Sequence, residues 1–386
     1  MKLAMSRRSL AAVLLLAVAL VACDKDKDVE PPKALVAFNA TLAVERAWTA
    51  GVGGKDRALR LALAPAVDAG RVFAAGDNGT VYAFDGKTGR SLWKAVAKLP
   101  LSGGPAAGNG LVVVGTSDGR VLALNEADGA RRWLVRVSGE VLSAPAIASQ
   151  VVVVRTVDGR VHGLAPDTGA ELWSNEQAVP RLTLRGTGRP VIAGDVVVCG
   201  FDNGKVAAYG LAKGDTMWES AVSPPHGRTE LERMVDIDGS LVVSGHDVLV
   251  TGFQGRVAML GLDSGQVWWS RDASSYRGLA LAAETIFVTT ADSHVIAVKR
   301  RDGTPVWDQD ALARRGLTSP VLDGDAIVVA DFEGHVHWLD AATGVLLGRI
   351  ATAKGRVTNA PVVADGFVYV QTDAGHLYAL RAHPKK

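Results

Sequence analysis

The sequence lacks an excess of charge of either sign. Lysine and arginine total 42 against 40 acidic residues, which gives a net charge of +2. Three of the basic residues, Lys2, Arg7 and Arg8, lie in the first 22 positions, so the rest of the chain carries a net charge of about −1. This balance excludes the basic footprint expected of a nucleic-acid-binding protein, and we expect no nucleic-acid partner.

Cysteine is almost absent as well, with only Cys23 and Cys199 in 386 residues. Cys199 ends the run Val-Val-Val-Cys, which predicts a small residue in a buried strand rather than a reactive thiol. Helical periodicity is also missing after residue 38. The fold is therefore expected to consist of strands.

The first 22 residues have the layout of a secretory signal. A short basic segment precedes the apolar run 10–22, which is too short to span a membrane. The run ends Leu20-Val21-Ala22-Cys23, which resembles the lipobox of bacterial lipoproteins. That resemblance implies cleavage before Cys23 and a lipid on its thiol, which would leave Cys199 without a disulfide partner. The alternative is an ordinary signal peptide beside a chance cysteine.

A charged, proline-containing stretch follows, from Asp24 to Lys33. It has no apolar periodicity, so residues 23–37 are predicted to form a flexible, solvated tether. The propeller described next is predicted to occupy residues 38–386.

A motif of about forty residues recurs along the rest of the chain. Each copy has an apolar run, an Asp-Gly or Asn-Gly step, a second apolar run, a Thr-Gly or Asp-Gly step and a tryptophan four residues later. These features predict four antiparallel strands joined by tight hairpins, which is the pattern of a propeller blade. The motif tryptophans are Trp93, Trp133, Trp173, Trp218, Trp269 and Trp307, and the seventh copy has Gly348 instead.

The eighth copy stops after Leu377-Tyr-Ala-Leu380 and lacks its last strand. Residues 38–49 contain Trp48 and precede the first full copy, so they can supply that strand. A solenoid, the rival architecture, would need polar caps at both ends. We therefore predict an all-β, eight-bladed propeller of the quinoprotein-like, tryptophan-motif type, closed by the N-terminal strand.

Two insertions interrupt the regular spacing. Consecutive motif tryptophans are 40 residues apart up to Trp173, then 45 residues to Trp218 and 51 to Trp269. Both insertions follow a tryptophan strand, so they should lie side by side on one face. Apolar and arginine side chains are typical of binding hot spots, and we predict an interface here rather than merely long solvated loops. The candidates are Leu182, Leu184 and Arg185, with Arg181 and Arg189 as further cations and Asp236 and Asp238 as nearby anions.

The tryptophan strand also resembles the motif of quinoprotein dehydrogenases, which bind pyrroloquinoline quinone over an adjacent Cys-Cys pair and a calcium ion. This chain has no such pair, so we predict no enzyme activity and no cofactor, with tryptophans that pack between blades. His335 and His337 share one strand face, but no third ligand repeats near them, so no metal site is predicted. The alternatives are a small periplasmic quinoprotein-like dehydrogenase or redox sensor, and a carbohydrate- or peptidoglycan-binding propeller.

The segments Leu182-Thr-Leu-Arg-Gly186, Thr229-Glu-Leu-Glu-Arg233, Asp236-Ile-Asp238 and Leu317-Thr-Ser-Pro320, together with Cys23, carry a closer resemblance. The chain resembles the BamB family, the lipoproteins of the outer membrane β-barrel assembly machinery. The resemblance spans nearly the whole mature chain. It implies a non-enzymatic scaffold whose two loops contact the POTRA domains of the central barrel subunit.

The same resemblance implies other lipoproteins of the assembly complex as partners, and nascent outer membrane proteins as a further class. It places Leu182, Leu184, Arg185, Asp236 and Asp238 at the POTRA contact. It also implies an anchor on the periplasmic face of the outer membrane. Asp24 directly after Cys23 departs from this pattern, because in enterobacteria an aspartate at that position favours the inner membrane.

Overall fold

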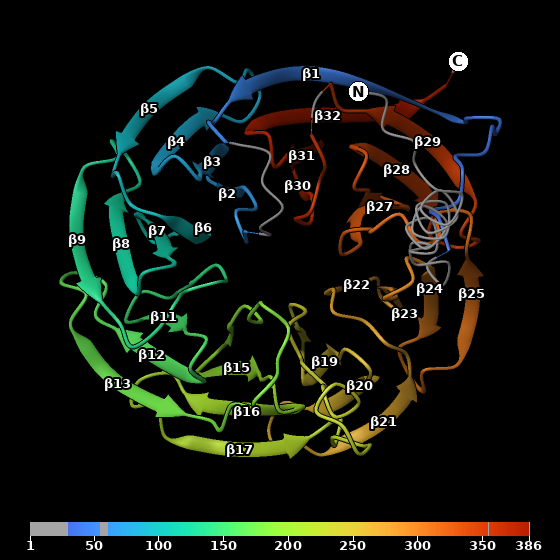
Figure 1. Ribbon diagram of the computed structural model, residues 1–386. Helices are drawn as coiled ribbons and strands as arrows, with labels where there is room; N and C mark the ends of the chain where they lie inside the picture. The colour runs from blue at the N-terminus through green and yellow to red at the C-terminus, as the bar shows by residue number, and fades with distance from the viewer. Residues whose placement is uncertain (1–29, 55–60, 354, 386) are drawn as a thin grey trace, which may run out of the picture.

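A ring of eight four-stranded antiparallel sheets makes up the molecule (Figure 1). The computed structural model describes residues 30–54, 61–353 and 355–385. The predicted all-β, eight-bladed propeller is confirmed. Among the described residues, none belongs to a helix long and apolar enough to cross a membrane.

Each blade runs from its inner strand to its outer strand in chain order, except the last. Blades 1 to 4 comprise β2 (Ala66–Asp68), β3 (Arg71–Gly76), β4 (Thr80–Asp85) and β5 (Ser91–Val96); β6 (Leu101–Gly108), β7 (Leu111–Thr116), β8 (Arg120–Asn125) and β9 (Arg131–Arg136); β10 (Ala146–Ile147), β11 (Val152–Arg155), β12 (Arg160–Leu164) and β13 (Glu171–Glu176); β14 (Val191–Ala193), β15 (Val196–Gly200), β16 (Lys205–Gly210) and β17 (Thr216–Ala221).

Blades 5 to 8 repeat this arrangement, with the N-terminal strand as the outer strand of blade 8. They comprise β18 (Val242–Ser244), β19 (Asp247–Thr251), β20 (Arg256–Gly261) and β21 (Val267–Asp272); β22 (Leu279–Leu281), β23 (Thr285–Thr289), β24 (Val295–Lys299) and β25 (Pro305–Gln309); β26 (Val321–Asp323), β27 (Ala326–Ala330), β28 (His335–Asp340) and β29 (Leu346–Ala351); β30 (Val362–Ala364), β31 (Phe367–Gln371), β32 (His376–Pro384) and β1 (Leu42–Gly51).

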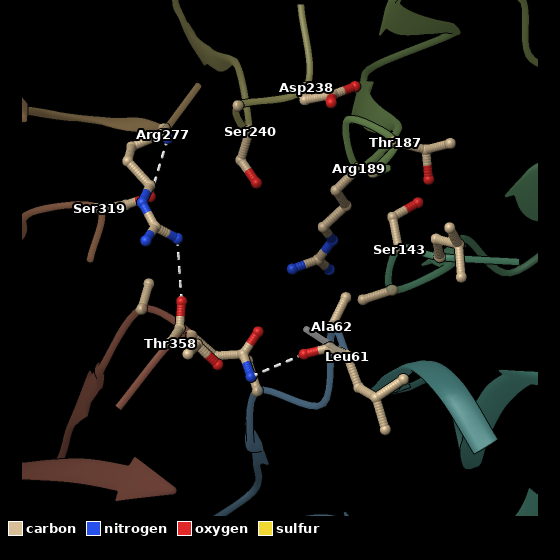
Figure 2. Close-up of a pocket in the computed structure, with 18 of the residues that line it drawn as sticks. Leu61, Ala62, Ser143, Thr187, Arg189, Asp238, Ser240, Arg277, Ser319 and Thr358 are labelled. Carbon is tan, nitrogen blue, oxygen red and sulfur yellow. Dashed lines mark hydrogen bonds between the residues drawn. The ribbon is translucent and has the colours of Figure 1, made fainter. Parts of the chain in front are cut away.

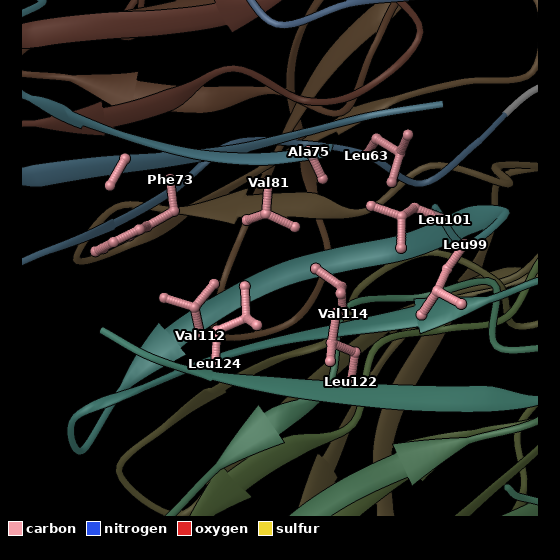
Figure 3. Close-up of a cluster of buried hydrophobic side chains, with 11 residues drawn as sticks. Leu63, Phe73, Ala75, Val81, Leu99, Leu101, Val112, Val114, Leu122 and Leu124 are labelled. Atoms are coloured by element: carbon pink, nitrogen blue, oxygen red, sulfur yellow. The ribbon is translucent and has the colours of Figure 1, made fainter. Parts of the chain in front are cut away.

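The core is divided among the blade interfaces. In β7, Val112 and Val114 pack against blade 1 (Figure 3). Leu111 and Val113 of the same strand pack against blade 3. Side chains alternate across a strand, so a strand that is buried on both faces needs an uninterrupted apolar run. This explains why the middle strands lack the apolar-polar alternation of a half-exposed sheet.

The ring closes through β1 and β32. Their register extends from Leu42 opposite Pro384 to Gly51 opposite His376. The predicted closure by the Trp48 strand is confirmed. Pairing the two chain ends within one blade leaves no interface between blades open.

Each motif tryptophan joins its blade to the next. Trp48 donates an Nε1 hydrogen bond of 2.8 Å to the carbonyl of Gly86 in blade 1. Its ring covers Gly89, whose φ is +69°, and a Cβ at that glycine would lie 2.6 Å from the ring. Glycine therefore meets two demands here, a left-handed turn and close contact with an aromatic ring. The six other motif tryptophans make the same Nε1 bond at 2.6–3.1 Å.

Gly348 interrupts this series for a structural reason. A motif tryptophan at this position would pack on the turn that joins the third and fourth strands of the next blade. Blade 8 has no such turn, because its third and fourth strands, β32 and β1, come from opposite ends of the chain. The backbone and side chain of Leu42 in β1 occupy the space instead, and a Cβ on Gly348 would lie 3.2 Å from both. The seventh blade thus lacks its tryptophan because the ring closes beside it.

Antiparallel connectivity sorts the loops onto two faces. The turns between second and third strands and the links from one blade to the next emerge together, and we call this side the link face. Gly204 illustrates the grouping, because this turn residue in blade 4 lies against Ser223 in the link to blade 5. Both insertions belong to the link face.

The segment before β1 contacts the propeller, which differs from the solvated tether expected over residues 23–37. The backbone N–H of Lys33 donates a hydrogen bond to the Ala313 carbonyl, and its ammonium group forms an ion pair of 2.6 Å with Asp310. Leu35 packs against the core between blades 6 and 7. Arg314 pairs with Glu30 at 2.9 Å. Docking therefore extends to residue 30, and residues 23–29 lie outside the described residues.

Candidate binding face and central cavity

The two long links lie beside each other on the link face. They span residues 177–190 and 222–241, and the backbone N–H of Leu184 in the first donates to the Asp236 carboxylate in the second. A Cβ on Gly186 would lie 2.9 Å from Asp238 Oδ2. The insertions thus form one continuous surface, as the blade geometry predicts.

Apolar side chains protrude from both links. Leu182 is 42% exposed, and Leu231 in the second link is 61% exposed. Reciprocal hydrogen bonds between Thr229 and Glu232 shape the turn that carries Leu231. Leu231 is not among the contact residues predicted from the sequence, although a lone leucine in a charged loop was a usable signal.

Arg185 sits at the rim of this surface. Its side chain is exposed and forms an ion pair of 3.0 Å with Glu140, from the link between blades 2 and 3. Leu184 beside it is half-buried. Three consecutive links therefore build the surface, and Glu140 could not be found from the insertions because its own link has ordinary length.

The expectation that Asp236 is a surface anion is wrong. Its side chain has no solvent exposure, and its carboxylate accepts the Leu184 N–H. Burial raises the pKa of Asp236 to about 7, with the nearby Asp202 acting in the same direction. Asp236 holds the two links together from inside, so it cannot meet a partner directly.

A buried ion pair lies beneath the links. Arg155 is 1% exposed, pairs with Asp202 and stacks over the Phe201 ring at 4.9 Å. Ile237 is anchored nearby by donating its backbone N–H to the Phe201 carbonyl. The base of the second link is therefore fixed to blades 3 and 4.

A cavity of about 680 Å³ opens where the links approach the ring axis (Figure 2). Alanine is the commonest of its lining residues, and three prolines also line it. Its charged lining residues are Arg185, Arg189, Arg277 and Asp238. The structure places Asp238, half-buried, at this wall, and turns Arg189 inward rather than along the loop rim.

A second polar cluster lies in blade 7. Asp331 accepts hydrogen bonds from Arg315 at 2.7 Å and from His337 at 3.2 Å, and Arg315 also pairs with Glu333. These partners hold the pKa of Asp331 well below its usual range, while burial lowers the pKa of His337. The ligand atoms of Asp331, Glu333 and His335 lie within 4.8 Å of one another, so they could hold a metal ion.

Two acidic residues, Asp331 and Glu333, thus accompany the histidine pair, and neither was predicted to do so from the sequence. Asp331 and Glu333 precede His335 in the same turn, so their spacing was visible in the sequence. Arg315 already neutralises both carboxylates and also donates to the Lys33 carbonyl at 3.1 Å. The cluster therefore helps to dock the N-terminal segment.

Cys199 is fully buried in β15, as its surroundings in the sequence predicted. Burial raises the pKa of its thiol to about 12. A protonated, inaccessible thiol is a poor nucleophile. Cys23 lies outside the described residues.

The fold and the site define a tryptophan-docked β-propeller with an elaborated link face around a central cavity. A family model described as outer membrane protein assembly factor BamB matches residues 19–97, 77–309 and 301–384. A protein of that name from Pseudomonas aeruginosa is 48% identical over 96% of this chain and 97% of the relative. One from Kangiella koreensis is 42% identical over 95% of each. The chain belongs to the BamB family of outer membrane protein assembly factors.

Solved structures agree with this assignment. The crystal structure of BamB from Moraxella catarrhalis has a TM-score of 0.81 at 27% identity, covering 88% of this chain and all of the other. A quinohemoprotein alcohol dehydrogenase from Comamonas testosteroni has a TM-score of 0.68 at 13% identity, over 87% of this chain and 76% of its own. The second likeness shows a shared fold alone.

Proposed function

We propose that this chain is a non-enzymatic scaffold of the outer membrane protein assembly complex, and that its link face binds the POTRA domains of the central barrel subunit. The observation that carries the proposal is the surface on two joined links, where Leu182 and Leu231 protrude beside Arg185. Exposed apolar anchors framed by an arginine are characteristic of binding hot spots. Family membership supports a partner within the outer membrane protein assembly complex.

The named residues have different parts in this contact. Leu182, Leu184 and Arg185 form the contact surface, and Leu231 extends it. The planar guanidinium of Arg185 can grip a carboxylate or paired carbonyls on the partner. Asp238 lies where the surface meets the cavity, and Asp236 acts indirectly by joining the links.

Membrane attachment completes the proposal. Lipidated Cys23 would anchor the chain to the periplasmic face of the outer membrane, near other assembly-complex lipoproteins. Nascent outer membrane proteins are a further candidate partner by strand addition, but closure leaves them only short outer edges such as β5 and β9. Separating the inner and outer membranes of cells and locating the protein in one of them tests this anchor, and we expect the outer membrane despite Asp24.

Binding of purified POTRA domains tests the scaffold. Arg185→Ala should weaken binding about thirtyfold, the effect of losing about 2 kcal/mol at a hot spot. Arg90→Ala is the matched control, because Arg90 is exposed on a turn of the opposite face. Both variants should melt like the parent, and equal binding by all three proteins would refute the assigned surface.

The quinoprotein alternative predicts a different result. Adding pyrroloquinoline quinone with calcium should leave the melting temperature of a scaffold unchanged. A ligand that binds only the native state must stabilise it. A saturable rise in melting temperature would therefore favour the dehydrogenase reading.

A further inference from the structure

One arginine at the ring-axis cavity has no side-chain partner among the residues that the structure describes. Within the described residues, the Arg189 guanidinium makes no hydrogen bond or ion pair, and Figure 2 shows it pointing into the cavity. Arg189 is exposed, although the protein around the cavity partly desolvates its guanidinium and lowers the pKa of that group. A guanidinium that points into a cavity without a counterion can form charge-assisted hydrogen bonds to an anion that enters there.

A second cation approaches from the opposite side. Arg277 is 7% exposed, donates to the Thr358 carbonyl at 3.0 Å and lies over the Tyr276 ring at 4.8 Å. These contacts hold its charge in place at the cavity wall (Figure 2). With Arg185 at the rim, three cations and one anion, Asp238, line the space.

The wall also offers uncommitted hydroxyl groups. Ser143 and Thr187 are 5% and 6% exposed, and among the described residues neither hydroxyl has a hydrogen-bond partner. Both residues line the cavity with Arg189. Buried polar groups are normally satisfied, so these two hydroxyls add unsatisfied polar groups to the wall close behind the cavity surface.

Apolar surface accompanies these polar groups. Phe253 and Tyr276 form an edge-on aromatic pair, with ring centroids 6.1 Å apart, at the same wall. The cavity volume falls within the range of small-molecule sites. A bare inorganic anion would leave this apolar surface uncovered, whereas an organic anion would cover it.

We propose that the central cavity binds an organic carboxylate, with the Arg189 guanidinium as its principal ligand and Arg277 as a fixed second cation. The carboxylate can come from a free small molecule or from an acidic side chain of a protein docked on the link face. The first source is independent of the proposed scaffold function, and the second rests on it.

Titration of the full mature chain with succinate tests the first source. Isothermal calorimetry at constant ionic strength should give saturable binding that Arg189→Gln weakens at least tenfold, because a charge-assisted fork of hydrogen bonds is lost. Arg189→Lys should retain part of the affinity. Arg90→Gln, on the opposite face, should bind like the parent, and inorganic phosphate should bind more weakly than succinate.

Binding of POTRA domains tests the second source. If succinate does not bind, Arg189→Gln should still weaken POTRA binding while Arg90→Gln does not. Leu182→Ala separates the two proposals, because Leu182 belongs to the proposed POTRA surface but does not line the cavity, so the change should reduce POTRA binding and leave succinate binding in place. Melting temperatures show whether each variant is folded. The proposal is overturned if Arg189→Gln changes neither succinate affinity nor POTRA binding.

Discussion

Gly129 should be intolerant of any side chain because Trp93 packs on it. Its φ is +72°, and a Cβ there would lie 2.6 Å from the Trp93 ring. Gly110 in the same blade has a φ of +76° but open space around the position of a Cβ. The pair separates backbone strain from the loss of packing between blades.

The two substitutions should differ severalfold in cost. Gly110→Ala carries only left-handed strain, about 1–2 kcal/mol. Gly129→Ala adds about 1–3 kcal/mol for overpacking against the ring. It also weakens the 2.9 Å bond from Trp93 Nε1 to the Glu126 carbonyl, which contributes about 1 kcal/mol. We therefore expect a total of roughly 3–6 kcal/mol for Gly129→Ala.

Urea unfolding followed by far-ultraviolet circular dichroism measures both costs. A double-mutant cycle sharpens the assay, because in a Trp93→Ala background Gly129→Ala should cost no more than Gly110→Ala. Equal losses for the two glycine variants in the parent, or an unchanged cost after removal of Trp93, would refute the view that the tryptophan dictates glycine at this turn.

Two aspartates should respond to pH with opposite signs, and the closing strand should dominate stability. Burial raises the folded-state pKa of Asp236 to about 7, so its contribution to stability is present below about pH 4 and lost as the pH rises through 7. Asp236→Asn should therefore melt at a higher temperature than the parent at pH 8. A difference in melting temperature between variant and parent that does not grow from pH 4 to pH 8 would contradict this. Asp331 has a lowered pKa, so Asp331→Asn should destabilise the protein by a few kcal/mol at pH 7, and this difference from the parent should shrink below pH 4. A difference in denaturant midpoint that stays constant with pH would count against the ion-pair explanation. Deleting residues 38–50 removes all of β1 except Gly51 and should abolish cooperative melting at the parent temperature. Retention of that transition by the truncated chain would show that closure contributes little.

Local patterns in the sequence were enough to determine the architecture. The hairpin turns, the apolar runs and the tryptophan recur at fixed spacing, and each acts within one blade or on its neighbour. The orphan strand with Trp48 and the unfinished eighth copy then specified closure. The insertions were visible as departures from the same period, so their position on one face also followed.

Only the tertiary structure decided how individual polar side chains in those loops are used. Asp236 is buried because Leu184, 52 positions earlier, donates to it across two links. Arg189 points into the cavity, while Arg185 is held at the rim by Glu140 from a third link. The docking of Lys33 likewise depends on blades almost 280 residues away. A repeat fixes the path of each blade, but the environment of a loop side chain arises where separate blades meet, and no local pattern records it.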